Sequence, residues 1–335
     1  MQRSLEKYRR QIQSGQINPL VHWDGRRSGV IFDPTDDSVP LEMLSFAAYR
    51  LEDGPFTIET GPREYALIPV DARYEVTVGR EVFRGHRAGG PFATLPASSN
   101  AEAVYVPAGV TCRLAGQGEL VAFAAPAAGQ KPPTQIRPGQ RPNLRRGTAA
   151  WHRDIVTLFS PENVTTSLIG GETYSPPALW SGTPPHVHDR DDPAGGQSDH
   201  EEVYYHLARV TEGRWGAYGV QLLFDDQGLD KAYLIHHRSA FAIPGAAHPV
   251  VSGPVSDMLY IWALTGPSSR LAMLDVDEFA YLKSLEQIID HFEAQRGVTT
   301  ISQSQFQAAV RRHGLDDVQA TLCRLHLLER GFAIQ

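Results

Sequence analysis

Residues Trp180–His206 read WSGTPPHVHDRDDPAGGQSDHEEVYYH, and this stretch decides which fold the chain is expected to adopt. It places His186 and His188 one residue apart, and side chains at positions i and i+2 of a β-strand point to the same face. Both imidazoles can therefore aim at one point. Glu202 opens the next apolar and aromatic run, which predicts a neighbouring strand. Further along, the run FAIPGAAHPV carries a Pro-Gly turn and then His248. Three histidines and one carboxylate from strands of one sheet predict a divalent-metal site.

The carboxylate position has two candidates, Glu201 and Glu202. Successive side chains of a strand point to opposite faces, so only one of the two can face the histidines. Alternation alone does not choose between them.

These motifs, in this order, resemble the cupin signature, in which paired histidines and a glutamate are followed by a Pro-Gly turn and a further histidine. In detail they resemble the 5-deoxy-glucuronate isomerases of inositol catabolism. They are similar, more distantly, to the ketol-isomerases that act on deoxy-hexosulose-uronates from pectin breakdown. The matching segments are Trp180–Gly182, Pro184–Asp189, Glu201–His206, Pro244–Val250 and Thr265–Pro267.

The resemblance implies a fold and a ligand set. The fold is an all-β bicupin, two jelly-roll β-barrels, here with a small C-terminal α-helical domain. The family motif places the second glutamate at the site, so the implied metal ligands are His186, His188, Glu202 and His248. They would hold one divalent metal ion, with Zn or Mn preferred and Fe or Ni as alternatives, because the spacing itself does not select a metal.

Composition sets the outer limits of the prediction. A chain of 335 residues is long enough for two or three domains, and 41% hydrophobic with 21% charged residues is typical of a packed globular protein. The net charge of −7, without a long basic block, argues against nucleic acid as a partner. The two cysteines are far apart, which indicates a reducing compartment. We find no apolar signal segment and no run near the length of a membrane span, so a cytoplasmic protein without a membrane partner is expected.

Changes in pattern predict five regions. Residues 1–17 form an N-terminal helix that packs on the first domain or on another subunit. Residues 18–128 form a cupin-like barrel of short strands, with expected strands at 56–60, 65–70, 73–78, 101–107 and 120–126. Residues 129–147 form a Pro-rich linker that crosses between the barrels. Residues 148–275 form the metal-binding barrel, with expected strands at 155–159, 166–174, 201–208, 215–224, 231–237, 239–244 and 258–266. Residues 276–335 form a small helical domain.

The first barrel is expected to lack metal ligands. It contains no His-x-His motif, and Cys112 stands near the position that His248 takes in the second half. The family resemblance reaches this half more weakly, in Gly89–Phe92 and Val104–Pro107.

The C-terminal helices depart from the family, which ends near residue 275. Their helix-turn-helix outline invites a DNA-binding interpretation. However, residues 275–335 hold nine Asp or Glu against six Lys or Arg, and phosphate binding requires the opposite balance. We therefore favour an oligomerisation or lid element, and we expect a homo-oligomer.

A site of this kind supports two chemistries. As a Lewis acid, the metal polarises adjacent carbonyl and hydroxyl oxygens of a sugar while a base moves a proton between two carbons, which is aldose–ketose isomerisation. With Fe and O2 the same ligands would make a dioxygenase. The resemblance favours an isomerase of a deoxy-glucuronate or related sugar acid. A third alternative, a non-catalytic sugar-binding regulator with the C-terminal helices as output, would not need all four ligand positions to be filled.

The catalytic residues are less defined than the ligands. Tyr204 is the first choice because alternation gives it the same face as Glu202, and His200 and Tyr260 are further candidates. His206 and His236 also remain open. The guanidinium fork matches a carboxylate, so the candidates for binding the acid group of the substrate are Arg146 (or its neighbour Arg145), Arg153 and Arg190.

Overall fold

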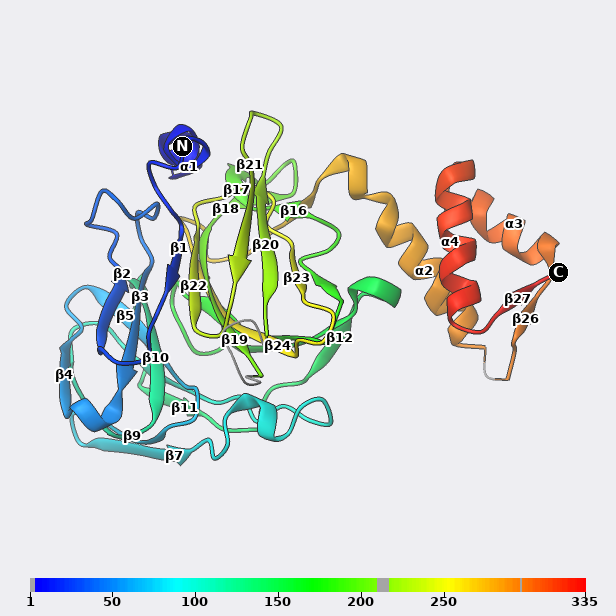
Figure 1. Ribbon diagram of the computed structural model, residues 1–335. Helices are drawn as coiled ribbons and strands as arrows, with labels where there is room; N and C mark the ends of the chain where they lie inside the picture. The colour runs from blue at the N-terminus through cyan, green and yellow to red at the C-terminus, as the bar shows by residue number, and fades with distance from the viewer. Residues whose placement is uncertain (1–3, 210–216, 296) are drawn as a thin grey trace.

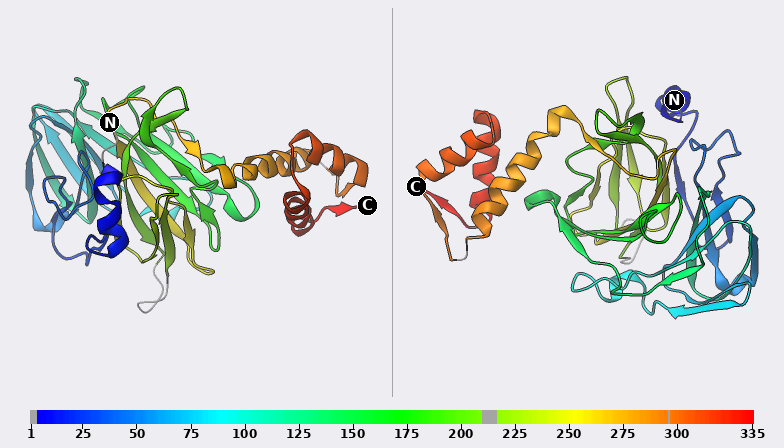
Figure 2. Two further views of the ribbon diagram at one scale, coloured as in Figure 1. Left: turned by 90° about the horizontal axis from the view of Figure 1, so that it is seen from above. Right: turned by 180° about the vertical axis from the view of Figure 1, so that it is seen from behind.

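The computed structural model describes residues 4–209, 217–295 and 297–335. This part of the chain is mostly β, with four α-helices. Two sheet-built units lie side by side, and a helical unit stands off from one end of them (Figures 1 and 2). The expected combination of a β-rich body and a helical C-terminus is confirmed.

The first unit consists of two antiparallel sheets that pack face to face. One sheet has the order β11-β8-β5-β10-β3-β2 and the other β4-β9-β6-β7. Leu67, Leu120 and Ala122 of the larger sheet pack with Val76 and Leu114 of the smaller one. The strands are β2 Gly29–Phe32, β3 Ser45–Arg50, β4 Phe56–Glu59, β5 Arg63–Pro69, β6 Arg73–Val78, β7 Glu81–His86, β8 Ala103–Val106, β9 Thr111–Gln117, β10 Glu119–Pro126 and β11 Thr134–Ile136.

The second unit repeats this arrangement. Its sheets have the orders β1-β22-β19-β24-β14-β13-β12 and β15-β23-β20-β21, and Phe241, Ile243 and Met258 pack against Leu223 and Ile235 between them. The strands are β1 Leu20–His22, β12 Leu144–Arg146, β13 Arg153–Phe159, β14 Ile169–Ser175, β15 Trp180–Ser181, β19 Glu201–Ala208, β20 Gly219–Phe224, β21 Asp230–Ile235, β22 Ser239–Ile243, β23 Val250–Ser252 and β24 Met258–Thr265. Two short pairs complete it: β16 His186–Val187 with β25 Leu274–Asp275, and β17 Asp189–Asp192 with β18 Gln197–Asp199.

Each run that was expected to be a strand overlaps a strand of the structure, although residues 215 and 216 of one run lie outside the described residues. The Pro-rich segment contributes an edge strand to each larger sheet, β11 to the first unit and β12 to the second. This agrees with an extended connector, since proline is tolerated at sheet edges.

The N-terminal segment belongs to the second unit. Helix α1 (Ser4–Ser14) buries Leu5, Tyr8 and Ile12 in the core of that unit, and β1 pairs antiparallel with β22. Figure 1 shows the helix above β1 and beside β21. The expected packing of this helix on the first barrel was wrong. Its apolar stripe lies against the second unit because β1 directs the chain there.

The helical unit has a separate core, which Trp151 of the second unit joins. It consists of α2 (Tyr281–Glu293), α3 (Gln303–Arg312) and α4 (Asp317–Glu329), with β26 (Thr300–Ile301) paired to β27 (Ala333–Ile334). Ser302 and Asp316 form capping boxes that begin α3 and α4. Ile289, Phe306 and Leu327 are buried together. None of the described helices is long and apolar enough to cross a membrane.

The two sheet units are joined by buried ion pairs as well as by apolar packing. Arg87 of the first unit donates from Nη1 to Glu172 Oε1 (2.5 Å) and from Nη2 to Glu172 Oε2 (2.7 Å) of the second. The side chains of both residues are nearly inaccessible, 1% and 3% exposed. A charge at such depth is tolerated only when it is paired and hydrogen-bonded.

We therefore expect Arg87→Ala to lower the free energy of unfolding by about 3–5 kcal/mol, because it leaves the Glu172 carboxylate buried without its partner. Urea denaturation followed by circular dichroism measures this. Arg84→Ala is the control: Arg84 pairs with Glu75 at the surface, where a pair contributes about 0–1 kcal/mol. Equal losses in the two variants would contradict the assigned role of the buried pair.

Candidate metal centre

The histidines and the glutamate of the sequence motifs come from three separate parts of the second unit. His186 lies on β16, and His188 lies between β16 and the β17–β18 hairpin. Glu202 lies on β19. His248 follows the turn after β22, where Ala246 has a positive φ of 70°. In the larger sheet β19 pairs with β22, and Glu202 lies opposite Ile243. Glu202 is therefore close to the turn that carries His248.

Three of these side chains form a tight group. The Nε2 atoms of His188 and His248 lie 3.4 and 3.3 Å from Oε2 of Glu202. The ligand atoms of all three residues lie within 4.8 Å of one another, which is a spacing that could hold a metal ion. His186 is outside this tight group, but its ring centroid is 5.4 Å from that of His248.

Backbone carbonyls orient all three imidazoles. The Nδ1 atoms of His186, His188 and His248 lie 3.0, 3.0 and 2.8 Å from the carbonyl oxygens of Pro184, His200 and Ala246. A carbonyl only accepts a hydrogen bond, so we assign the proton to Nδ1 in each ring. Each Nε2 is then left with its lone pair, which is the usual tautomer of a metal-ligating histidine.

The charges of the cluster fit a cation. Burial alone would raise the pKa of Glu202, but the facing His188 and His248 lower it to about 2, so the group is a carboxylate. Burial and the neighbouring His248 lower the pKa of His186 to about 3, so this ring is neutral. Nε2 of His248 is buried without a hydrogen bond. The lone pairs of the imidazole Nε2 atoms and the Glu202 carboxylate repel each other in a buried site unless a positive charge lies between them. Nitrogen and carboxylate donors of this kind suit a divalent metal.

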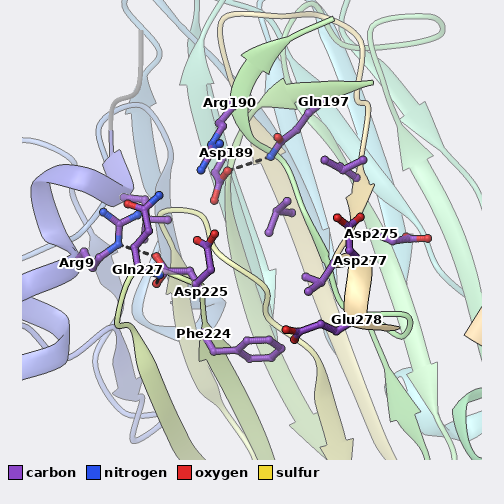
Figure 3. Close-up of a pocket in the computed structure, with 15 residues that line it drawn as sticks. Arg9, Asp189, Arg190, Gln197, Phe224, Asp225, Gln227, Asp275, Asp277 and Glu278 are labelled. Carbon is purple, nitrogen blue, oxygen red and sulfur yellow. Dashed lines mark hydrogen bonds and ion pairs between the residues drawn. The ribbon is translucent and has the colours of Figure 1, made fainter. Parts of the chain in front are cut away.

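A second layer of hydrogen bonds fixes the turn that carries His248. Asp189 accepts from the Ala246 N–H through Oδ2 (2.8 Å) and from Gln197 Nε2 through Oδ1 (2.9 Å; Figure 3). Gln221 Nε2 donates to the His248 carbonyl at 2.6 Å. Asp189 was part of the quoted motif, but its contact with a turn about sixty residues away has no local sequence signal.

A cavity of about 270 Å3 opens beside the cluster. Tyr204 and Tyr260 stack on its wall with ring centroids 4.4 Å apart. Arg146 and Arg153 also line it, as do Gly182 of the matching segments and several residues that the sequence did not single out: Leu144, Ile155, Thr157, Ile169, Thr173, Trp262, Leu264, Leu271 and Met273. Arg153 Nη1 donates to the carbonyl of Thr183 at 2.9 Å.

Two candidates from the sequence lie away from this cavity. Arg190 lines a separate cavity of about 650 Å3, together with Asp189 and Asp225 (Figure 3). The hairpin turns it away from the side to which His188 points. His200 is buried with Nδ1 2.9 Å from Ser198 Oγ, and it does not line the cavity. Its backbone carbonyl, rather than its ring, supports His188.

The remaining candidates are separated by strand alternation. Glu201 faces the first unit, where it accepts hydrogen bonds from the backbone N–H groups of residues 42–44. His206 lies deeper, with its ring 5.6 Å from that of Tyr260 and with both nitrogens buried and without a hydrogen bond. His236 is outside the cavity lining and lies 5.4 Å from His22, ring to ring.

We expect Asp189→Ala to weaken Zn2+ binding about 10- to 100-fold, because it frees the turn that orients His248. Titration calorimetry on metal-free protein measures the affinity. Asp189→Asn keeps one acceptor oxygen for Ala246 N–H and should recover part of the loss. Asp191→Ala, an exposed change in the same hairpin, is the control. Equal Zn2+ affinities for the Asp189→Ala and Asp191→Ala variants, or a loss of affinity that is accompanied by global unfolding, would contradict the role of Asp189 in orienting His248.

Comparison with known proteins gives a consistent picture. Residues 20–282 match the KduI/IolB family. The 5-deoxy-glucuronate isomerase of Geobacillus kaustophilus is 27% identical over 246 residues, which cover 71% of this chain and 85% of that protein. That of Listeria innocua is 27% identical over 248 residues, with 71% and 86% covered.

Solved structures agree on the fold. An IolB-like protein from Salmonella typhimurium has a TM-score of 0.71 at 24% identity and covers 79% of this chain and 99% of its own. A mutant oxalate decarboxylase of Bacillus subtilis, at 10% identity, has a TM-score of 0.53 and covers 83% and 84% of the two chains. These likenesses show a cupin-like fold and nothing of the chemistry. With most of its length matched, the chain belongs to the KduI/IolB family.

Proposed function

We propose that this protein is a metal-dependent aldose–ketose isomerase that acts on 5-deoxy-glucuronate or a closely related sugar acid. The observation that carries the proposal is one cavity lined by His188 and Glu202 of the cluster and by the guanidinium-bearing Arg153. The name shared by the curated relatives, 5-deoxy-glucuronate isomerase, supports the same reaction.

The proposed ligands of the metal are His186, His188, Glu202 and His248. Zn or Mn is preferred, and Fe and Ni stay as alternatives, because nitrogen and carboxylate donors accept all four. When bound, such an ion acts as a Lewis acid on neighbouring carbonyl and hydroxyl oxygens and makes the proton on the adjacent carbon easier to remove.

Arg153 is the proposed contact for the carboxylate of the substrate. Its Nη1 donates only to the backbone carbonyls of Trp151 and Thr183, and it forms no ion pair within the part of the chain that is described. Burial lowers its pKa, but a guanidinium stays charged at neutral pH. A half-buried cation with free N–H groups on a cavity wall matches a sugar acid. Arg146 lies at the exposed rim and can add a second contact.

Tyr204 and Tyr260 are the proposed hydroxyl contacts of the substrate. Burial raises the pKa of both phenols, so each is neutral and donates its O–H rather than acting as a base. The Tyr260 hydroxyl is 2.6 Å from Ser181 Oγ. We propose that the Tyr204 hydroxyl donates a hydrogen bond to the sugar oxygen that gains negative charge during the isomerisation. Neither His200 nor Arg190 keeps a role in this proposal, since neither lines the cavity.

The first test combines metal analysis with NMR of deoxy-uronates under nitrogen. We expect about one equivalent of divalent metal, and conversion of aldose to ketose signals that stops after chelation and returns with added metal. Turnover that begins only when air is admitted to iron-loaded protein would replace the isomerase with an oxygenase. Sugar binding without turnover in metal-loaded protein would favour the regulator.

Arg153→Met should raise KM for the sugar acid about 10- to 100-fold, because a charged hydrogen bond to the carboxylate is lost. A matched uncharged sugar should show no such change. Arg145→Met is the control, since Arg145 is 68% exposed and pairs with Asp154 outside the cavity. The same KM in wild type and Arg153→Met would remove Arg153 from the proposal and leave the isomerase reaction standing.

A further inference from the structure

Two arginines of the cavity stand opposite each other at the end of one hairpin. β12 and β13 are antiparallel, and their register pairs Arg146 with Arg153. Both side chains line the cavity. Like charges directly across a strand pair repel each other, so this end of the hairpin needs support from elsewhere. β12 offers little, because it is an exposed edge strand of three residues.

The segment that joins the two strands, residues 147–152, is a tight turn. Gly147 has a φ of 75°, and a Cβ there would collide with the carbonyl oxygen of Trp151. The Trp151 N–H donates to the Thr148 carbonyl at 2.9 Å. The Trp151 carbonyl in turn accepts from Arg153 Nη1 at 3.3 Å. The conformation of this turn therefore helps to determine where the guanidinium of Arg153 lies.

The C-terminal helical unit contacts the turn at three points. Glu286 of α2 accepts from the Gly147 N–H through Oε1 at 3.0 Å. Arg330 donates from Nη2 to Thr148 Oγ1 at 3.3 Å. Trp151 is buried in the core of the helical unit. Figure 1 shows the turn after β12, in green, reaching toward α2.

We propose that Glu286 is a positioning residue, which holds the turn through the Gly147 N–H and so presents Arg153 to the carboxylate of the substrate. This role rests on the proposed function, in which Arg153 binds that carboxylate. Glu286 is not among the described residues that line the cavity, so it acts through the turn and does not touch the substrate. It also lies beyond residues 20–282, the part that matches the family. The support is thus a contribution of this chain's C-terminal unit.

The charge of Glu286 and its hydrogen bond have opposite effects on substrate binding. Burial lowers the pKa of Arg153, and the nearby Tyr260 phenol and Glu286 carboxylate oppose that shift, so the carboxylate is within electrostatic reach of the guanidinium. A negative charge there repels an anionic substrate. A purely electrostatic role therefore predicts tighter binding when the charge is removed. A positioning role predicts weaker binding when the hydrogen bond is removed.

Steady-state kinetics separate the two roles. Glu286→Ala removes the acceptor for the Gly147 N–H and should raise KM for the sugar acid about 3- to 10-fold, the effect of one hydrogen bond, with kcat nearly unchanged. Glu286→Gln keeps an acceptor oxygen without the charge, so its KM should be at or below the wild-type value. Asp290→Ala, an exposed change one turn further along α2, is the control and should keep the wild-type KM. A KM that stays the same or falls in Glu286→Ala, or that rises equally in Glu286→Gln, overturns the proposal.

A double-mutant cycle tests whether Glu286 acts through Arg153. In an Arg153→Met background, Glu286→Ala should raise KM no further, because the contact that it positions is already lost. An equal rise in KM in both backgrounds overturns the proposal, since the effect would then come from elsewhere in the fold.

Amide hydrogen exchange of the full chain gives a readout that needs no turnover. Glu286→Ala should speed exchange in a peptide that contains residues 147–151, and Glu286→Gln should not. Unchanged exchange in Glu286→Ala overturns the positioning role, whatever the reaction is. A wild-type chain that binds the sugar acid without isomerising it counts against the proposed function alone, and the calorimetric Kd then replaces KM in the same comparisons. A chain that binds no sugar acid overturns both.

Discussion

Strand β19 is buried on both of its faces, and the position of the candidate centre depends on this. Val203, Tyr205 and Leu207 pack against the first unit, while Glu202 and Tyr204 point into the second. A slip of one residue would exchange the two sets, place Val203 or Glu201 where Glu202 stands and turn His206 toward the apolar first unit, so the register is strongly specified. The first unit therefore contributes to the position of the site. Although none of the proposed ligands lies in it, its apolar sheet determines which side of β19 faces the histidines.

Buried carboxylates at the boundary between the two units further limit how the units can be placed relative to each other. Glu64 of the first unit accepts from the backbone N–H groups of residues 166–168. Glu119 accepts from the Tyr205 hydroxyl and from Arg238 Nε, both at 2.6 Å. Glu201 of the second unit accepts from residues 42–44 in the same way. An ionised carboxylate away from water is costly unless nearly all its lone pairs are used. Such groups therefore tolerate few relative positions of the two sheets, and apolar packing alone would tolerate more.

The sequence predicted those features of the site that depend on neighbouring residues. The His-x-His spacing, the alternation around Glu202 and the turn before His248 were enough to expect these side chains together. Long-range pairings had no such signal. That β1 joins β22 depends on contacts between residues about 220 positions apart, so the helix before it was assigned to the wrong unit. Arg190 is close to His188 in sequence, but the β17–β18 hairpin turns it into another cavity. Arg153 has no stronger local signal, and β13 places it on the cavity wall because β13 pairs with β14, which lies beside β24.

The lining of the cavity combines charged and apolar side chains, and this bears on the kind of reaction it can support. The Glu202 carboxylate and the Arg153 guanidinium both border it, together with Ile155, Trp262 and the neutral phenol of Tyr204. Apolar wall limits the number of water molecules beside a bound sugar, and a lower dielectric strengthens each remaining charge. A proton removed from one carbon then has few acceptors other than the groups that hold the substrate. We therefore expect more of that proton to return to the adjacent carbon than in an open site, while the isomerisation itself proceeds whether the returning proton comes from the substrate or from solvent.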